Sequence, residues 1–388
     1  MSLKNNMKIL INAFGIQDSG GITVLDKLFR ELECSSNNDE HIIICHKNKN
    51  ILKLIKIYEK YENLTFEVII NKGLIHRFYL ENIFFRRLIK ERNIDLVYNF
   101  SGSAQFFSKI PQITKVHNLL FYSLKLDKIY FEKKEYLKWL KQIFIKRVLF
   151  IMMLKQTKYI EIQSSHVKEY ISDFLNIQNK FFYIKSDISL EKNDFTYVKK
   201  YNFLCKIKFL YIIGPHFEYI HKNFEDFVKI MLKFKEEKNF DFEIDITLTT
   251  KQLHSSRIWD KSLDKHTNFL GYINKNEIVK KFQDNSILIS TSVIETLGLH
   301  VIEALQNGIL TIVPNELYSN SVYGNNILTY ELFDINNMIE KIKQIYLLND
   351  NNIKDIILNN QQYLINNENT KYETVIDIFN EILKDNNV

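Results

Sequence analysis

Short apolar runs alternate along the chain with segments whose apolar positions repeat every three or four residues. Such runs are typical of strands buried on both faces, and the longer repeats between them, as in Val24–Leu32, favour helices. Strands that alternate with helices indicate a parallel α/β sheet. In the first half we predict strands at Met7–Ala13, His41–Cys45, Phe66–Ile70, Leu96–Asn99 and Ile113–Val116.

The same rhythm resumes after Ser186–Lys208, a segment rich in Lys, Asn, Asp and Ser that we interpret as a linker. Helices are predicted from about Phe224, over Leu299–Asn307 and, at the end of the chain, over Tyr372–Lys384. The pattern therefore predicts an α/β protein with two β/α sheets that face each other across a cleft. Further strands are predicted at Phe209–Gly214, Phe242–Thr249, Ile287–Thr291 and Ile309–Val313.

Composition narrows the class of protein. The chain has 388 residues, 46% hydrophobic and 25% charged, which is typical of a globular protein with two domains. Its three cysteines, Cys34, Cys45 and Cys205, form no C-x-x-C pair, so the sequence supports neither a zinc site nor a redox motif. The apolar run at Ile9–Phe14 is too short for a signal peptide, and no run approaches the ~20 residues that cross a bilayer. We therefore expect a cytoplasmic protein.

The strand at Ile287–Thr291 leads through a loop into the helix that begins at Leu299. Ligands of open α/β sheets bind outside the carboxyl ends of the strands, so Glu295 is expected at the edge of the cleft. Glu303, one turn into the helix, could accept hydrogen bonds from both ribose hydroxyls of a nucleotide. In isolation, both glutamates could equally be solvated surface residues. Backbone N–H groups at such a helix start form a phosphate site, here at Thr296, Leu297, Gly298 and Leu299.

The spacing around these glutamates resembles the E-x7-E signature of retaining GT-B glycosyltransferases, particularly those of family 4. The resemblance covers about Phe209–Asn337 and includes an H-K-N segment at His221–Asn223. It implies two Rossmann-like domains, which we place at 1–190 for the acceptor and 191–370 for the nucleotide sugar. The helix in 371–388 is then expected to cross back to the first domain.

The resemblance also implies roles for individual residues. Lys222 would bind the donor diphosphate and Glu295 the hydroxyls of the transferred sugar, with Glu303 at the ribose. The family usually has an arginine a few residues before this lysine, whereas this chain has Pro215, His216 and Phe217 there, and His216 or His221 could partly take its place. In the first half, Gly20 and Gly21 resemble the family's glycine-rich loop, and His117 resembles a histidine that contacts the donor sugar. Without the resemblance, these two features would be a ligand-free turn and a structural histidine.

The implied reaction moves a sugar from a UDP- or GDP-sugar to a glycan or lipid-linked glycan in cell-surface polysaccharide synthesis. No tightly bound cofactor is expected. No metal is expected either, because the chain has no D-x-D triad, and Asp241, Glu243 and Asp245 are expected on a half-exposed strand face. The alternatives are a sugar-nucleotide epimerase or phosphorylase of the same fold, and a pseudo-transferase that binds donor without turnover. A nicotinamide dehydrogenase is disfavoured, since the glycines after the first strand do not form G-x-G-x-x-G.

Positive charge is concentrated in residues 125–158, which hold ten Lys or Arg and three Asp or Glu. Within this window, a long helix over about Ile129–Leu154 repeats apolar residues at spacings of three and four. Such a helix suits a surface of anionic lipids, and peripheral contact with the cytoplasmic membrane face is one interpretation. The other is that the apolar side is core and the lysines are solvated. We expect no nucleic-acid partner, because the second half offers no matching basic patch.

Overall fold

The computed structural model describes residues 7–16, 19–35, 39–70, 73–188, 190, 195–196, 198–202, 206–237, 240–366 and 372–386. It divides into two compact units, each built on one parallel sheet, which confirms the predicted α/β class. The first unit is Met1–Ser123, Tyr136–Ile188 and Asn369–Val388, and the second is Leu124–Glu135 and Ser189–Glu368. Parts of the predicted linker, including Cys205, lie outside the described residues.

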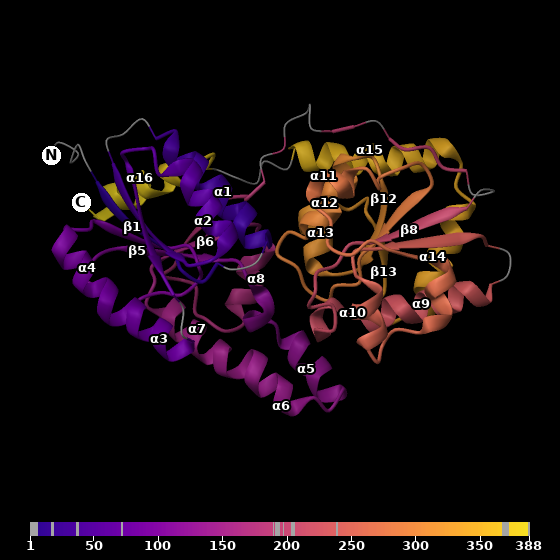
Figure 1. The fold of residues 1–388 in the computed structure, drawn as a ribbon, viewed down its shortest axis with the longest axis horizontal. Coiled ribbons are helices and arrows are strands. Elements are labelled where there is room, and N and C mark those ends of the chain that lie inside the picture. The colour runs from indigo at the N-terminus through magenta and orange to yellow at the C-terminus, as the bar shows by residue number, and fades with distance from the viewer. Residues whose placement is uncertain are drawn as a thin grey trace. The chain divides into compact units, whose positions relative to one another are not determined.

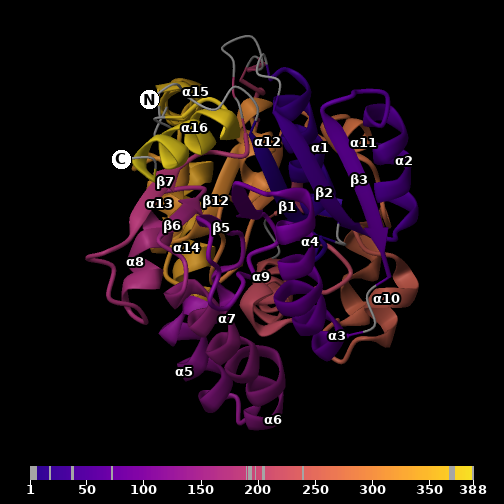
Figure 2. The same ribbon diagram turned by 90° about the vertical axis from the view of Figure 1, so that its left-hand side faces the viewer.

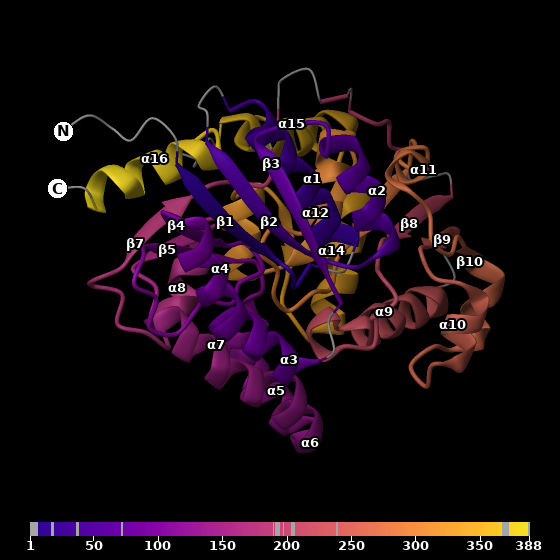
Figure 3. The same ribbon diagram turned by 60° about the vertical axis from the view of Figure 1, so that its left-hand side comes forward.

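The sheet of the first unit has seven strands in the order β3-β2-β1-β4-β5-β6-β7, all paired in parallel. The chain builds outward from β1 to β3 and then returns to β4 on the other side of β1, so the winding reverses between β1 and β4. Figure 3 shows β1, β2 and β3 side by side. The strands are β1 (Lys8–Ala13), β2 (Glu40–His46), β3 (Leu64–Ile69), β4 (Leu96–Asn99), β5 (Gln112–Val116), β6 (Tyr159–Ile162) and β7 (Phe181–Ile184).

Helices cover both faces of this sheet, because alternate residues of each strand point to opposite sides. Ile9 and Ile11 of β1 pack with α1 (Ser19–Glu33), α2 (Lys49–Tyr58) and α16 (Val375–Asn386). Leu10 faces the other layer, made by the π-helical η1 (Leu80–Phe84) and α4 (Phe85–Arg92). The yellow α16 therefore lies beside the indigo α1 in Figure 1, although the two are far apart in sequence. The first unit also contains the short helices α3 (Leu74–Tyr79), η2 (Leu119–Tyr122) and α8 (His166–Ser172).

The helical stretch predicted over about Ile129–Leu154 is interrupted after α5 (Leu124–Glu132). Lys134 has a φ of 56°, a left-handed conformation that no helix continues through. α5 belongs to the second unit, so the expected 1–190 range departs from the observed unit at Leu124–Glu135. The chain then forms three consecutive helical pieces of the first unit: α6 (Tyr136–Trp139), the π-helical η3 (Leu140–Phe144) and α7 (Ile145–Lys155).

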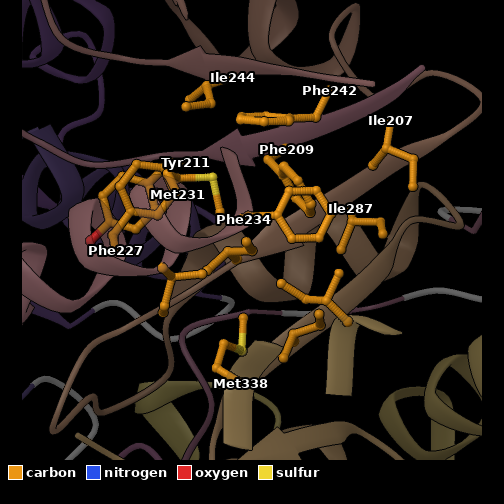
Figure 4. Packing of buried hydrophobic residues seen from close by; sticks show 14 of the residues in the cluster. Ile207, Phe209, Tyr211, Phe227, Met231, Phe234, Phe242, Ile244, Ile287 and Met338 are labelled. Atoms are coloured by element: carbon orange, nitrogen blue, oxygen red, sulfur yellow. The ribbon is translucent and has the colours of Figure 1, made fainter. Parts of the chain in front are cut away.

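The second unit has a six-stranded sheet in the order β10-β9-β8-β11-β12-β13. In Figure 4, Phe209 and Tyr211 of β8 pack against Phe227, Met231 and Phe234 of α9. The strands are β8 (Ile207–Tyr211), β9 (Phe242–Ile246), β10 (Thr267–Phe269), β11 (Ser286–Ile289), β12 (Leu310–Pro314) and β13 (Leu328–Tyr330). The helices are η5 (Ile220–Lys222), α9 (Phe224–Glu236), α10 (Thr250–Ser255), η6 (Lys261–His266), α11 (Lys275–Val279), α12 (Leu299–Gln306), α13 (Leu317–Tyr323), α14 (Ile335–Tyr346) and α15 (Asp350–Asn366).

Candidate active site

The loop after β11 leads directly into α12, as the sequence predicts, and its geometry depends on Gly298. This residue has a φ of +59°, which L side chains rarely adopt. A Cβ built on it would lie 2.1 Å from the hydroxyl of Tyr323. Both the backbone conformation and the close approach therefore require glycine immediately before the helix.

Two buried tyrosines of α13 hold this loop by its carbonyl groups. The Tyr318 hydroxyl donates to the Ser292 carbonyl over 2.6 Å, and the Tyr323 hydroxyl donates to the Leu297 carbonyl over 3.0 Å. Each is a hydrogen bond from a fully buried side chain, so losing one would leave a desolvated carbonyl. The start of α12 is fixed before any ligand binds.

A second set of hydrogen bonds joins this loop to the segment that carries Lys222. The Thr291 hydroxyl donates to the Lys222 carbonyl over 2.9 Å and lies 2.7 Å from the Tyr211 hydroxyl. The Val293 N–H donates to the His221 carbonyl over 2.8 Å. The two strand-end loops, after β8 and after β11, are thus joined through their backbones.

This arrangement brings together two of the predicted site residues, Lys222 and Glu295. Their side chains form an ion pair of 2.7 Å, and both are mostly buried. Burial would raise the pKa of Glu295, but the Lys222 ammonium, with His300 and a hydrogen bond from Ser292, lowers it to about 2. Glu295 is therefore a carboxylate at neutral pH, able to accept hydrogen bonds from hydroxyl groups.

Two histidines beside this ion pair, His221 and His300, are neutral at pH 7. Burial, reinforced by Lys222, lowers the pKa of His221 to about 3. Burial also lowers the pKa of His300 to about 4, and its Nε2 lies 3.3 Å from the Ser290 hydroxyl. His216 is exposed and stacks on Tyr219 with ring centroids 5.0 Å apart. In this structure, His221 does not replace the charge of the arginine that the resemblance leads one to expect.

The remaining predicted residues of the second unit lie along the start of α12. The first N–H groups of a helix have no intrahelical acceptor, so α12 presents those of Leu299 and His300 at its N-terminus. Thr296 is partly exposed there and Leu297 is buried. Glu303 lies one turn further along α12 and is partly exposed. The loop and the helix start combine an anionic side chain, a cationic side chain and backbone donors.

In the first unit, Gly20 and Gly21 lie within the first turn of α1, which begins at Ser19 rather than after the glycines. Neither glycine has the positive φ that would require this residue type. A Cβ added to Gly20 would meet nothing within 4 Å, whereas one on Gly21 would lie 3.0 Å from Ile16. The backbone at Gly20 is thus open to close approach. Gln17 and Asp18, which precede this turn, lie outside the described residues.

His117 follows β5, at the carboxyl edge of the same sheet. Its Nε2 donates to the Phe100 carbonyl over 2.5 Å, and its ring meets the Phe100 ring edge-on. Burial, together with the charge of Lys115, lowers the pKa of His117 to about 4. The neutral ring with its proton on Nε2 leaves Nδ1 as a hydrogen-bond acceptor.

The acidic alternation on β9 differs from its prediction, because Asp245 is buried rather than half-exposed. It accepts a hydrogen bond of 2.7 Å from the Asn268 amide and lies 3.4 Å from the Lys281 ammonium. Within the described residues, no group of three or more His, Cys, Asp or Glu side chains is placed to hold a metal ion.

Part of the chain matches a known protein family. Residues 211–385, which include the whole Lys222–Glu295 site, match the family model described as "Glycosyl transferases group 1". This part of the chain belongs to the group 1 glycosyl transferases. No curated protein sequence matches the chain.

Solved structures with the same fold cover nearly the whole chain. The lipopolysaccharide outer core galactosyltransferase WaaB is 16% identical with a TM-score of 0.61, over 93% of this chain and 96% of that protein. A glycosyltransferase from Rickettsia africae is 15% identical with a TM-score of 0.62, over 98% of each chain. HepE from Anabaena, solved with UDP and glucose, is 10% identical with a TM-score of 0.61, over 97% of this chain and 98% of that one. The fold of this glycosyltransferase is therefore GT-B.

Sequence reasoning missed several residues that shape the site of this glycosyltransferase. Tyr211, Tyr318 and Tyr323 hold its loops, and His300 lies beside Glu295, yet none belongs to a local motif. The tyrosines act across 26 to 80 residues of sequence, so a pattern read along the chain gives no signal for them.

Proposed function

We propose that this glycosyltransferase retains the configuration of the sugar that it moves and works without a metal ion. The donor would be a UDP- or GDP-sugar, and the acceptor a glycan or lipid-linked glycan of a cell-surface polysaccharide. The observation that carries the proposal is the Lys222–Glu295 pair beside the N-terminus of α12. The names of similar structures support the substrate classes, since one holds UDP and glucose and another is an outer-core galactosyltransferase.

In this proposal, the site stabilises charge on the departing diphosphate. Lys222 and the first N–H groups of α12 would bind the phosphates, because an ammonium and a helix N-terminus both favour anions. Glu295 would accept hydrogen bonds from the sugar hydroxyls, and Glu303 from the ribose. Within the first unit, the Gly20–Gly21 backbone and Nδ1 of His117 are the groups that we propose to contact substrate.

The proposed reaction forms the bond between the acceptor oxygen and the anomeric carbon on the face from which the diphosphate leaves. The bond from that carbon to the diphosphate oxygen breaks, and the proton of the acceptor hydroxyl passes to the departing phosphate. No residue need then serve as the base, and positioning with charge stabilisation supplies the rate enhancement.

The first experiment measures donor binding by thermal shift with UDP, GDP and ADP. A nucleotide at one hundred times its Kd should stabilise the protein by roughly 2.7 kcal/mol. Lys222→Ala should abolish the shift. Lys229→Ala should keep it, because Lys229 lies on α9 and pairs with Glu225 instead. No shift with any nucleotide would contradict the proposed donor site.

The second experiment follows the sugar itself, by incubation with donor and candidate acceptors and NMR of the anomeric centre. Retention and transfer in the presence of EDTA are expected. Isomerised donor without transfer would instead identify an epimerase. If Glu295→Ala and Lys222→Ala left the cellular function intact, the chain would be a pseudo-transferase.

We further propose that this enzyme works at the cytoplasmic membrane face, where α6, η3 and α7 contact anionic lipids. The apolar side of these helices is solvent-exposed rather than core, with Leu137 at 74% exposure. Exposed lysines lie between the apolar side chains, including Lys138, Lys141 and Lys155. Large apolar residues flanked by cations favour the interface of an anionic bilayer. The exposed set is Tyr136, Leu137, Leu140, Phe144, Ile145, Val148 and Met152.

Vesicle sedimentation tests this contact. Within the described residues, no helix is long and apolar enough to cross a bilayer. Each large side chain that enters the interface contributes up to ~1.5–3 kcal/mol. Leu137→Glu with Val148→Glu should therefore weaken binding to phosphatidylglycerol vesicles at least ~tenfold. Leu347→Glu, at an 85% exposed site of the second unit, is the control. Equal vesicle binding by the wild type and both variants would rule out this surface as the membrane contact.

A further inference from the structure

The exposed face of α2 carries a row of lysines that the proposed reaction does not use. Lys49, Lys53 and Lys56 occupy positions i, i+4 and i+7 of α2, which place them on one side of the helix, and Lys60 lies two residues beyond its end. Lys47 precedes the helix, and all five side chains are exposed. In the part of the chain that the structure describes, no ion pair or hydrogen bond uses the ammonium of Lys47, Lys49, Lys53 or Lys56.

This arrangement costs stability to the helix that carries it. Lysines three or four residues apart are neighbours on a helix surface and repel one another. The α2 sequence, KNILKLIKIY, contains no carboxylate that could offset the repulsion. An anionic partner on this face would turn the repulsion into attraction.

The lysines line a shallow, open groove of about 670 Å³. Its apolar floor is formed by Leu52 of α2 and Ile70, the residue just beyond β3. Figure 2 shows α2 beside β3 at the edge of the sheet. The charged rim consists of Lys47, Lys49, Lys53 and Lys56. A charged rim over an apolar floor suits a chain of sugar rings that carry anionic groups.

The groove opens at the edge of the sheet where the proposed substrate residues lie. Lys47 and Ile70 directly follow the carboxyl ends of β2 and β3, as His117 follows that of β5. β2 and β5 are separated by β1 and β4, so their ends are three strand spacings, or about 14 Å, apart. That distance corresponds to a few sugar residues.

We propose that this lysine groove binds a phosphate- or carboxylate-bearing segment of the acceptor glycan, a few sugars from the hydroxyl that reacts. The inference rests on the proposed function for its choice of a glycan. The face of α6, η3 and α7 presents large apolar side chains, whereas the α2 groove has four lysines along its rim. A linear polyanion fits such a groove better than a planar membrane does.

Fluorescence anisotropy with a labelled oligogalacturonate tests the binding directly and needs no donor. The wild-type protein should bind this probe at 50 mM NaCl, lose affinity at 300 mM NaCl, and bind a neutral maltooligosaccharide of equal length far less. Each exposed ion pair contributes a factor of roughly 1.4 to 5. Lys49→Glu/Lys53→Glu/Lys56→Glu should therefore weaken binding roughly tenfold or more.

The matched control reverses three exposed charges elsewhere on the same unit, with Lys90→Glu/Arg92→Glu/Lys109→Glu. Its affinity for the probe should lie within about twofold of the wild-type affinity. At low salt, the lower net charge of the control should weaken binding slightly more. The milder Lys53→Gln/Lys56→Gln should give an intermediate loss and covers the case in which charge reversal unfolds α2. Equal losses of probe affinity in the control and in the α2 variant would contradict the proposal that the groove binds the glycan.

Two further measurements separate the possible ligands and the two proposals. Lysine-dependent binding of phosphatidylglycerol vesicles or single-stranded DNA, without binding of the oligogalacturonate, would overturn the glycan assignment. The thermal shift with UDP and transfer to a short neutral acceptor should be unchanged in the α2 variant, while the KM for a long anionic acceptor rises. Loss of probe binding therefore reports on the groove, and loss of the nucleotide shift reports on the donor site.

Discussion

The contact between Gly298 and Tyr323 makes a quantitative prediction about the loop that carries Glu295. Gly298→Ala places a residue with a Cβ in left-handed backbone, which costs about 1–2 kcal/mol. The new Cβ also occupies the place of the Tyr323 hydroxyl and breaks its bond to the Leu297 carbonyl. A buried carbonyl left without a donor costs about 1–3 kcal/mol more. We therefore expect a total loss of about 2–5 kcal/mol.

Tyr323→Phe supplies the matched comparison, because it removes the same hydrogen bond without the backbone cost. Alone it should cost about 1–3 kcal/mol. In Gly298→Ala it should cost almost nothing, since the Cβ then faces a ring carbon 3.4 Å away and the hydrogen bond is already lost. Urea denaturation of the four proteins gives this double-mutant cycle. Additive losses would refute the claim that the two residues share one contact, and an unchanged UDP affinity in Gly298→Ala would refute its role in the donor site.

Three other predictions concern buried ionisable groups. Glu295 has its pKa lowered to about 2, so its stabilisation of roughly 3 kcal/mol is present above about pH 4.5 and is lost as the pH falls to 2. The stability gap between wild type and Glu295→Gln should therefore close over that window in urea titrations. Burial lowers the pKa of His41 to about 4, and neither ring nitrogen has a partner among the described residues. His41→Leu should thus retain stability at pH 7 and lose less than wild type between pH 6.5 and 4. Lys115 is buried between Glu161 and Asp187. Lys115→Ala should lower the free energy of unfolding at pH 7 by about 3–5 kcal/mol, measured by urea denaturation followed by circular dichroism. A loss under about 1 kcal/mol would contradict the importance of these ion pairs.

Much of the fold could be predicted because its signals are local. Continuous β-branched runs marked most strands, and β4 lies at the predicted residues. Short edge strands such as β10 and β13 were not predicted, because three residues are too few to show a periodicity. The break in the helical stretch expected over about Ile129–Leu154 was missed for a different reason. Its apolar repeats are real but face solvent, and the left-handed turn at Lys134 has no side-chain signature.

In the candidate site, too, the residues that belong to local motifs could be predicted and the contacts between distant residues could not. The E-x7-E spacing and the H-K-N segment are local, and they led to Lys222 and Glu295. The distance between those residues in space depends on Thr291 and Tyr211, which join the two loops across the sheet. The α2 lysines form no sequence motif, and they lie on one face only because the chain is helical there.

The absence of the usual arginine has a physical consequence for donor binding. In the ligand-free site, Lys222 is already paired with Glu295, and the neighbouring His221 and His300 are neutral. A diphosphate that binds alone must therefore compete with a carboxylate for one ammonium, and it leaves Glu295 without a partner. A nucleotide sugar avoids this cost, because its hydroxyls can donate to Glu295 while its phosphates take Lys222. We accordingly expect the intact donor to bind more tightly than its nucleoside diphosphate, and we expect Glu295→Gln to remove most of that difference in calorimetry. Tighter binding of UDP to the wild type than of any UDP-sugar would show that the ion pair is no barrier to the phosphates.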